Sequence, residues 1–297
     1  MMFELPAEIT AYLSELDAFI EREIKPIEQR DDNIRFFDHR RENARTDWDN
    51  DGHPRADWWA LLAEMRAVAD KAGHYRFAIP AEFGGKDGSN LAMAAIRYHL
   101  AKKGLGLHND LQNESSIVGN LVQVLMLRDF GTEQQKRDFI PQMLAGKMGW
   151  SFGLTEEHHG SDATHMDTRA VPEVRDGVAG YLINGNKMWT TGLPYTSHVM
   201  TFARTNGEDG KARGITCFVV PTDAPGFEIG EYMWTFNMPT DHPKVKYTNV
   251  WVPESAILGK LDEGLAVAQH FVHENRIRQA ASSLGAAQYC IDEAVKY

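Results

Sequence analysis

The spacing of apolar residues changes twice along this chain, and these changes constrain the fold more than any other feature. Over residues 6–147 apolar side chains recur at helical spacing, from residue 148 they alternate, and over 265–297 they return to helical spacing. The two patterns place side chains with different periods, so one segment cannot serve both. The chain is therefore expected to fold into successive helical and β regions.

We predict an α+β multidomain protein with three parts. An N-terminal α-helical domain spans 1–147, a middle β-barrel or β-sandwich domain spans 148–260, and residues 261–297 form the first helix of a third, helical domain. The length of 297 residues supports this division. Single hydrophobic cores usually stop growing near ~250 residues.

Charge-rich and glycine-rich stretches divide the N-terminal region. Residues 31–55 carry many charges and few aliphatic side chains, which predicts a solvated surface insertion. Residues 77–85 hold one proline and two glycines and predict a loop. Thr132-Glu-Gln-Gln135 resembles a capping box. Helices are predicted at 91–102, 115–130 and 132–144.

The middle region is predicted to be built from strands. Asn184-Gly185 is the dipeptide most typical of a β-hairpin turn. Strand-like runs follow at 197–203, 214–221 and 245–252. We therefore expect a hairpin centred on residue 184, followed by an antiparallel sheet.

Charge and cysteine content exclude several classes of function. The net charge of -11 argues against a nucleic-acid partner, which requires a basic face. Cys217 and Cys290 are too few for a disulfide framework and too far apart for a metal-ligand pair. No run approaches the ~18 apolar residues of a membrane span. The first residues lack the charged-then-apolar layout of a secretory signal and the Arg-rich pattern of a transit peptide, so neither is expected. We expect a cytoplasmic protein, or one of the mitochondrial matrix if eukaryotic, with no membrane association.

Two short runs, residues 152–162 and 187–191, carry the side chains that suit a bound flavin. Thr155, Gly160 and Ser161 supply hydroxyl and backbone N–H donors for a ring edge and a diphosphate. Trp189 and Thr191 are expected on the same side of an extended strand, because side chains alternate with period two. The plain alternatives are a polar loop and a half-buried hairpin anchor.

These runs resemble a known family. Leu154-Thr-Glu…Gly-Ser-Asp162, Asn184-Gly-Asn-Lys-Met-Trp-Thr-Thr191 and Asn249-Val-Trp-Val-Pro253 match, in order, the middle-domain signatures of the acyl-CoA dehydrogenases. The resemblance extends from the N-terminal helices to Tyr297. It implies FAD as cofactor and a C-terminal helical bundle that begins near residue 261.

The resemblance also implies roles for single residues. Thr155 contacts the flavin ring, Phe152 and Leu154 approach it through their backbone, and Gly160 and Ser161 line the diphosphate. Trp189 covers one face of the ring and Thr191 donates toward its N5 atom. Ser161 also contacts the CoA part of the substrate, which Arg276 binds through its planar guanidinium. Arg278 is a weaker candidate. The ordinary alternative for Arg276 is a solvated helix cation.

One departure from the family lies beside the predicted diphosphate site. Many members carry a small triplet before the glycine, whereas this chain has Glu157-His158-His159. The added bulk either strengthens cofactor binding or crowds it. We predict no metal site, because neighbouring side chains on an extended backbone point in opposite directions.

The catalytic base is the second departure. Desaturation of an acyl-CoA needs a carboxylate to remove the α-proton. In a minority of the family that carboxylate lies just before the arginine, where this chain has Asn275, whose amide cannot accept a proton at neutral pH. Glu274 is a weak substitute, because a shift of one residue turns a helical side chain by about 100°. The base is therefore expected beyond Tyr297, with the chain a fragment that is inactive alone.

The resulting expectation is an FAD-dependent acyl-CoA dehydrogenase. It would pass electrons to an electron-transferring flavoprotein and assemble as a homodimer or homotetramer. The alternatives are a non-catalytic flavin- or acyl-CoA-binding protein of the same fold, and an acyl-CoA oxidase or flavin monooxygenase. Acyl chain length and branching are not readable from these residues.

Overall fold

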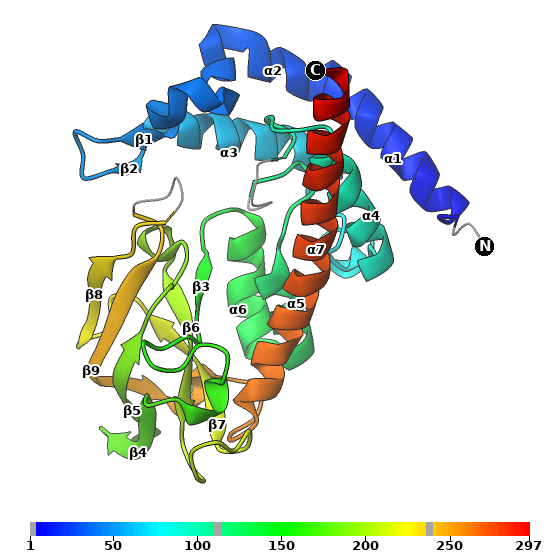
Figure 1. Cartoon of the computed structure of the whole chain (residues 1–297). Helices are drawn as coiled ribbons and strands as arrows, with labels where there is room; N and C mark the ends of the chain where they lie inside the picture. The colour runs from blue at the N-terminus through cyan, green and yellow to red at the C-terminus, as the bar shows by residue number, and fades with distance from the viewer. Residues whose placement is uncertain (1–3, 110–114, 236–239) are drawn as a thin grey trace. The chain divides into compact units, whose positions relative to one another are not determined.

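The computed structural model describes residues 4–109, 115–235 and 240–297 (Figure 1). The chain forms two compact units, a helical unit of residues 1–122 and 273–297 and a β unit of residues 123–272. Its α+β class is as predicted, with N-terminal helices, a middle sheet and a long final helix. Domain boundaries at 147 and 260 remain a prediction.

The helical unit is built around amphipathic helices whose apolar faces meet in one core. Leu16, Met65 and Ile96 come from three of these helices and are completely buried. The helices are α1 (Ala7–Phe19), α2 (Lys25–Gln29), α3 (Ala56–Lys71) and α4 (Asn90–Ala101), with a π-helical turn η1 (Ile20–Ile24) between α1 and α2 and a short 3-10 helix η4 (Ala81–Phe83) before α4.

The predicted solvated insertion at 31–55 is partly wrong. It contains the 3-10 helices η2 (Arg30–Phe37) and η3 (His39–Arg45) and a small hairpin of β1 (Thr46–Asp47) and β2 (His53–Pro54). Phe36 is buried with its ring 5.2 Å from that of Trp58, and the Arg45 guanidinium lies 4.4 Å over the same indole. Aromatic and cation–π contacts anchor the segment, which a count of aliphatic residues overlooks.

The helix predicted at 115–130 begins later than expected. Helix α5 spans Val122–Phe130, whereas Ser116 forms an isolated bridge with Asn109. The capping box is confirmed: in α6 (Glu133–Leu144) the Thr132 hydroxyl accepts from the Gln135 N–H, and the Gln135 side chain accepts from the Thr132 N–H. Gln135 also donates to the carbonyl oxygens of Ser255 and Ile257, which ties α6 to residues 255–257 within the β unit.

The β unit contains one curled eight-stranded sheet with a separate apolar core (Figure 1). Strand order is β10-β7-β6-β4-β5-β9-β8, and β3 pairs in parallel with β6. The strands are β3 (Trp150–Gly153), β4 (Arg169–Arg175), β5 (Val178–Lys187), β6 (His198–Arg204), β7 (Ile215–Pro221), β8 (Phe227–Tyr232), β9 (Pro243–Pro253) and β10 (Ile257–Leu258).

The predicted hairpin exists, but its turn is not at Asn184-Gly185. Strands β4 and β5 pair from Arg175↔Val178 outward, so the two-residue turn is Asp176-Gly177, with φ of 50° and 77°. Those angles suit a type I′ turn. Asn184-Gly185 instead forms a bulge inside β5, where the Asn184 side chain accepts from the N–H of Asn249. A Cβ on Gly185 would lie 2.4 Å from the Thr168 hydroxyl oxygen, so glycine is needed there for close packing.

Helix α7 (Gly264–Lys296) confirms the long helix predicted at the end of the chain. Its first residues belong to the β unit, where Phe271 stacks on Phe152 with ring centroids 4.2 Å apart. From His273 onward it belongs to the helical unit. None of the helices in the described part of the chain is long and apolar enough to cross a membrane.

Candidate functional site

Trp189 and Thr191 lie on a turn rather than on a strand. Strand β5 ends at Lys187, and Trp189 adopts the left-handed region at φ 58°. The N–H of Thr191 donates to the Trp189 carbonyl oxygen at 3.0 Å, which closes the turn. The expectation that both side chains project from one face of a strand is therefore wrong, because the period-two rule ends where the strand ends. A bulky residue in this region is strained and is often associated with function.

Backbone hydrogen bonds from two other segments of the chain hold the turn at residues 188–192 in place. The Met188 N–H donates to the Thr155 carbonyl oxygen at 3.0 Å, which places Thr155 beside the start of the turn. The Thr190 N–H donates to Pro243 and the Gly192 N–H to Asp241, at 3.3 and 2.8 Å. Residues 152–162 thus lie against residues 187–191, as they must if the two runs form one site.

A buried ion pair supports the same junction. Lys187 Nζ lies 2.6 Å from Glu156 Oε1 and donates to the Leu154 carbonyl oxygen at 3.2 Å, and the Lys187 side chain is fully buried. Burial lowers the pKa of the Lys187 ammonium to about 8, against the opposing attraction of Glu156. Burial alone would raise the pKa of Glu156, but the Lys187 charge and its hydrogen bonds hold it below the ordinary value.

The loop with Gly160 and Ser161 follows a tight turn in which Glu156 and His159 exchange backbone hydrogen bonds at 3.2 and 3.3 Å. Both Gly160 and Ser161 are exposed, and a Cβ on Gly160 would meet nothing within 4 Å. Among the described residues, none hydrogen-bonds to the hydroxyl group of Thr155 or of Ser161. The exposed donors of this loop are therefore available to a ligand.

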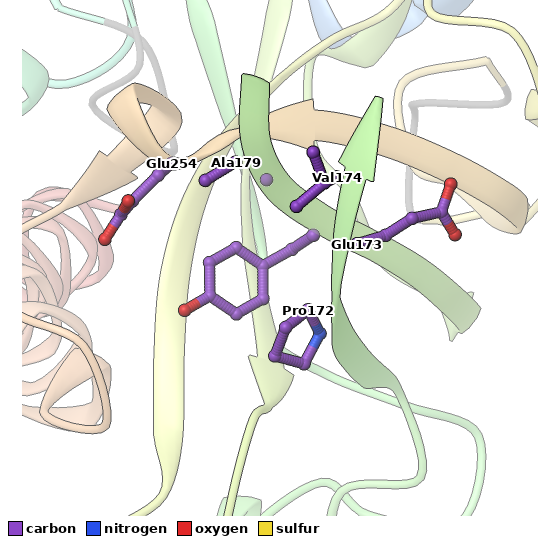
Figure 2. A pocket seen from close by; sticks show the side chains of 7 residues that line it. Pro172, Glu173, Val174, Ala179 and Glu254 are labelled. Carbon is purple, nitrogen blue, oxygen red and sulfur yellow. The ribbon is translucent and has the colours of Figure 1, made fainter. Parts of the chain in front are cut away.

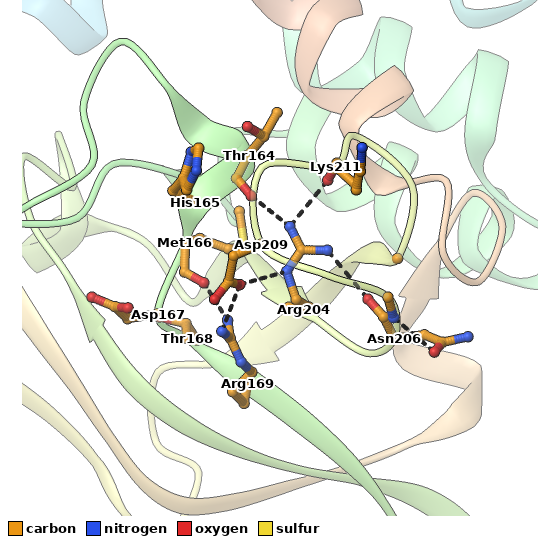
Figure 3. A network of polar contacts seen from close by, with 12 residues as sticks. Thr164, His165, Met166, Asp167, Thr168, Arg169, Arg204, Asn206, Asp209 and Lys211 are labelled. Carbon is orange, nitrogen blue, oxygen red and sulfur yellow. Dashed lines mark hydrogen bonds and ion pairs between the residues drawn. The ribbon is translucent and has the colours of Figure 1, made fainter.

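Arg204 anchors the segment that follows this loop (Figure 3). Its guanidinium is almost completely buried and donates to the carbonyl oxygen of Thr164 at 2.6 Å and to three carbonyls of the 206–213 loop, those of Asn206, Lys211 and Arg213. Asp209 lies 3.3 Å from its Nε atom. Burial lowers the pKa of Arg204, although Asp209 opposes this. One buried cation thus joins two surface loops.

The two histidines before Gly160 lie in different surroundings. His159 Nε2 lies 3.4 Å from Asp167 Oδ2, and the His159 ring stacks on that of His165 at 6.1 Å. His158 is exposed. Over residues 4–109, 115–235 and 240–297, no three histidine, cysteine, aspartate or glutamate side chains are grouped so that they could hold a metal ion.

Phe152 lies on β3, and Leu154 directly follows the strand and precedes Thr155. The Phe152 ring packs between Phe202 and Phe271, with centroids 5.0 and 4.2 Å away. The side chain is thus used in packing. The predicted approach of the Phe152 backbone to a flavin stays a prediction. The Leu154 carbonyl oxygen is already bound by Lys187.

The two charged residues predicted on α7 differ in their surroundings. Arg276 is exposed, in keeping with either predicted reading. Glu274 receives hydrogen bonds from Asn90 Nδ2 at 3.0 Å and from Arg278 Nη2 at 2.7 Å. Arg278, ranked below Arg276 from the sequence, is buried and also donates to Asn120. Burial lowers the pKa of Arg278 against the attraction of Glu274.

A shallow hollow in the β unit has no relation to these residues. Its volume is about 180 Å³, and it lies on the β4–β5 hairpin between Pro172, Val174, Tyr181 and Glu254 (Figure 2). None of the residues predicted for the flavin or for CoA lines it. The predicted site is thus a set of exposed donors and rings at the ends of β3 and β5.

Comparison with known proteins matches most of the chain to two domain families. The acyl-CoA dehydrogenase N-terminal domain profile matches residues 28–147, and the middle domain profile matches residues 151–249. The chain belongs to the acyl-CoA dehydrogenase family. The middle-domain match contains all seven residues predicted to contact the flavin.

Two curated relatives of this chain match it over only part of their own length. The mitochondrial short/branched chain specific acyl-CoA dehydrogenase of Rattus norvegicus is 34% identical over 74% of this chain and 48% of its own length. The 3-(aryl)acrylate reductase of Clostridium sporogenes is 32% identical over 76% of this chain and 57% of its own length. The chain therefore spans about half the length of these two relatives.

A solved structure supports the fold. The acyl-CoA dehydrogenase of Geobacillus kaustophilus superposes with a TM-score of 0.70 at 22% identity, covering 100% of this chain and 70% of that one. At this level of identity the match establishes the fold alone.

Sequence reasoning missed several residues that shape the site. Lys187 and Glu156 entered the sequence interpretation only as parts of family signatures, because Asn184 and Asn186 beside Lys187 make the end of this strand look polar. Asp241 and His242 carried no signal, because they lie far along the chain from Thr191 and meet it only through the fold.

Proposed function

We propose that this chain forms the cofactor-binding part of an FAD-dependent acyl-CoA dehydrogenase. One observation carries the proposal: an exposed indole and three threonine or serine hydroxyls lie on two joined segments at the ends of β3 and β5. The Trp189 side chain is 41% exposed although it is large and apolar. A flat aromatic ligand would cover that surface, and the hydroxyls of Thr155, Ser161 and Thr191 are the donor types a flavin edge and a diphosphate need.

The proposal gives each of these residues a task. Trp189 shields one face of the ring system from water, and Thr155 and Thr191 donate to its polar edge. Gly160 and Ser161 present backbone N–H groups and a hydroxyl to the diphosphate. FAD would supply the acceptor for the hydride that leaves the β-carbon of the acyl group. Donors placed where charge develops favour that transfer.

We propose that the α-proton is removed by a carboxylate other than Glu274. Both oxygens of the Glu274 carboxylate already accept hydrogen bonds, one from Asn90 and one from Arg278. A base held in this way is poorly suited to take a proton from carbon. Arg276, which is exposed on the same helix, is proposed to bind CoA.

FAD titration of the polypeptide tests the cofactor assignment. Trp189→Ala should weaken FAD binding at least tenfold, measured by quenching of flavin fluorescence, because the ring loses its apolar cover. Trp234→Ala is the matched control, since Trp234 is an exposed indole of the same unit and has no assigned contact with the cofactor. Equal affinity in wild type and Trp189→Ala would contradict the assignment.

Anaerobic addition of straight and branched acyl-CoA thioesters to the whole gene product tests the reaction. Loss of the yellow flavin absorbance is expected. A spectral shift without bleaching would favour the second candidate, a non-catalytic flavin- or acyl-CoA-binding protein, which the occupied Glu274 and the amide of Asn275 support. Rapid reoxidation of the reduced flavin by oxygen would instead indicate an oxidase or monooxygenase.

The remaining assignments follow from the family. We propose an electron-transferring flavoprotein as electron acceptor, a homodimer or homotetramer as the assembly, and the bacterial cytoplasm or the mitochondrial matrix as the compartment. The 3-(aryl)acrylate reductase relative carries a name that denotes reduction of a carbon–carbon double bond. Reoxidation of the reduced flavin by an enoyl-CoA should therefore be measured beside the forward reaction.

A further inference from the structure

His242, the residue directly before β9, contacts Trp189 and Thr191, two of the side chains proposed to contact the flavin ring. His242 Nδ1 lies 2.8 Å from the Thr191 hydroxyl oxygen, and the His242 ring meets Trp189 edge-on at 6.4 Å and 63°. The side chains of Asp241 and His242 are only 14% and 13% exposed. Asp241 Oδ1 accepts from the Gly192 N–H at 3.0 Å, so this pair is fixed against the turn.

The position of Asp241 decides which way the hydrogen bond between His242 and Thr191 runs. A neutral imidazole carries hydrogen on one nitrogen only, so Nδ1 is either the donor or the acceptor toward Thr191. Asp241 Oδ2 lies 4.0 Å from the same Nδ1 atom. That distance is too long for a hydrogen bond, so Asp241 acts on His242 through the electrostatic field of its oxygen, which favours a hydrogen over a lone pair on Nδ1. The arrangement favours Nδ1–H as donor to Thr191.

When Nδ1–H of His242 donates to the Thr191 hydroxyl oxygen, the hydroxyl hydrogen of Thr191 remains free to be donated to another group. Thr191 is exposed, and its other contact, the Trp189 carbonyl oxygen, is at 3.5 Å, the outer limit of a hydrogen bond. If Nδ1 were instead the acceptor, the hydroxyl proton would point into the protein and Thr191 could only accept from a ligand.

We propose that His242, oriented by Asp241, is a positioning residue that directs the Thr191 hydroxyl proton outward, toward the bound flavin. This inference rests on the proposed function, because it takes from there the contact between Thr191 and the cofactor. The reduced flavin carries added negative charge at its polar edge, so a hydroxyl that donates to it should raise the midpoint potential.

The midpoint potential of bound FAD is the readout that separates positioning from folding. Thr191→Val measures the effect of losing the donor and should lower the potential. His242→Leu should lower it in the same direction by at least half as much, and the double variant should match Thr191→Val alone, because His242 acts through Thr191. His242→Asn should recover most of the potential that is lost in His242→Leu, because the Asn amide lies nearest the position of Nδ1. His242→Gln should recover less.

His198→Leu is the matched control for loss of an imidazole. The His198 ring packs against Phe139 and Trp150 in the same unit, at 5.5 and 6.2 Å. Its loss should lower the midpoint of thermal unfolding without changing the flavin potential.

The outcomes separate the two levels of inference. A wild-type polypeptide that binds no FAD overturns the proposed function and this inference with it. Wild type that binds FAD, with Thr191→Val lowering the potential and His242→Leu leaving it unchanged, overturns the inference alone. So does a double variant whose shift equals the sum of the single shifts, and so does a Thr191→Val variant with the wild-type potential.

Discussion

Lys187 carries its ammonium group into the interior of the β unit, where Glu156 is its charged partner. The side chains are 0% and 4% exposed, so each charge has given up nearly all of its hydration. Such a pair adds little net stability, yet breaking it leaves one charge buried and unpaired. The pair also spans from β5 to the loop that carries Thr155, so its loss should affect both stability and the site.

Lys187→Met should destabilise the protein by about 3–5 kcal/mol, because Glu156 is left without its cation. The double variant Lys187→Met/Glu156→Leu should recover part of that loss, since an apolar pair of similar volume needs no compensation. Urea denaturation followed by tryptophan fluorescence measures the free energy of unfolding. Lys136→Met, which removes a cation from an exposed pair with Glu133, is the control and should change stability by less than about 1 kcal/mol. A double variant less stable than Lys187→Met would contradict this account.

The same residue predicts a pH dependence. Burial lowers the pKa of folded Lys187 to about 8 from an ordinary value of 10.5. Between these values the unfolded chain binds more protons at this position than the folded chain, so the contribution of Lys187 to stability rises with pH. The difference in unfolding free energy between wild type and Lys187→Met should therefore shift in favour of wild type from pH 8 to pH 10. A shift in favour of the variant would show that the pKa is raised rather than lowered.

At the scale of elements, the packing of α7 on α4 depends on one glycine. A Cβ at Gly285 would lie 2.4 Å from the Tyr98 carbonyl oxygen and 2.9 Å from the Ala101 Cβ. In an exposed helix a change from glycine to alanine gains about 1 kcal/mol of helix propensity. Here the backbone of α4 must move to make room, and overpacking of this kind costs about 1–3 kcal/mol. The steric effect is expected to win.

Gly285→Ala should therefore lower the midpoint of thermal unfolding, and Gly285→Val should lower it further. Ser283→Ala is the matched control, because Ser283 is exposed on the same helix and gains propensity without a clash. The midpoint of thermal unfolding of Ser283→Ala should be equal to or higher than that of wild type. If Gly285→Ala is more stable than wild type, the two helices have room to adjust and the close contact is not required.

Strong local signals were the ones that predicted elements correctly. The period of α7, the capping box at Thr132 and the strands around 197–221 depend on nearby residues, and each appears where expected. The turn predicted at Asn184-Gly185 was wrong because the same stretch contains a second dipeptide, Asp176-Gly177, that also suits a type I′ turn. The pairing of β4 with β5 selects Asp176-Gly177, and the contact with Asn249 gives Asn184 another use.

The site was predictable in its residue types and not in its geometry. The sequence order of Thr155, Ser161, Trp189 and Thr191 suffices to suggest a flavin. The left-handed backbone of Trp189 and its contact with His242 depend on segments about fifty residues apart meeting in space. Local periodicity carries no information about such meetings.

At the scale of the whole molecule, the proposed roles divide between the two units. The residues proposed to contact the flavin all belong to the β unit, whereas Arg276 and Glu274 belong to the helical unit. Each unit has its own apolar core. Cofactor affinity should therefore respond mainly to changes in the β unit, and CoA affinity to changes on α7.

The helical unit also exposes a regular apolar stripe on α7. Ile277, Leu284 and Ile291 are seven residues apart and are 44%, 64% and 57% exposed. The alanines at 280 and 287 between them, and the alanine at 294 after Ile291, are exposed as well. Large and small apolar residues that alternate at heptad spacing suit packing against another helix. Contiguous apolar surface of this kind usually marks an interaction face.

This stripe predicts that the 297-residue polypeptide associates in solution through α7. Light scattering after size-exclusion chromatography should give a mass above that of one chain of 33.5 kDa, rising with concentration. Leu284→Lys/Ile291→Lys should shift the mass toward one chain, because each lysine places a charge in the stripe. Val174→Lys/Val178→Lys is the matched control, since those valines are 69% and 50% exposed on the β4–β5 hairpin and lie off α7. If the hairpin variant loses association and the α7 variant keeps it, the interaction face lies on the sheet and the heptad stripe has no part in assembly.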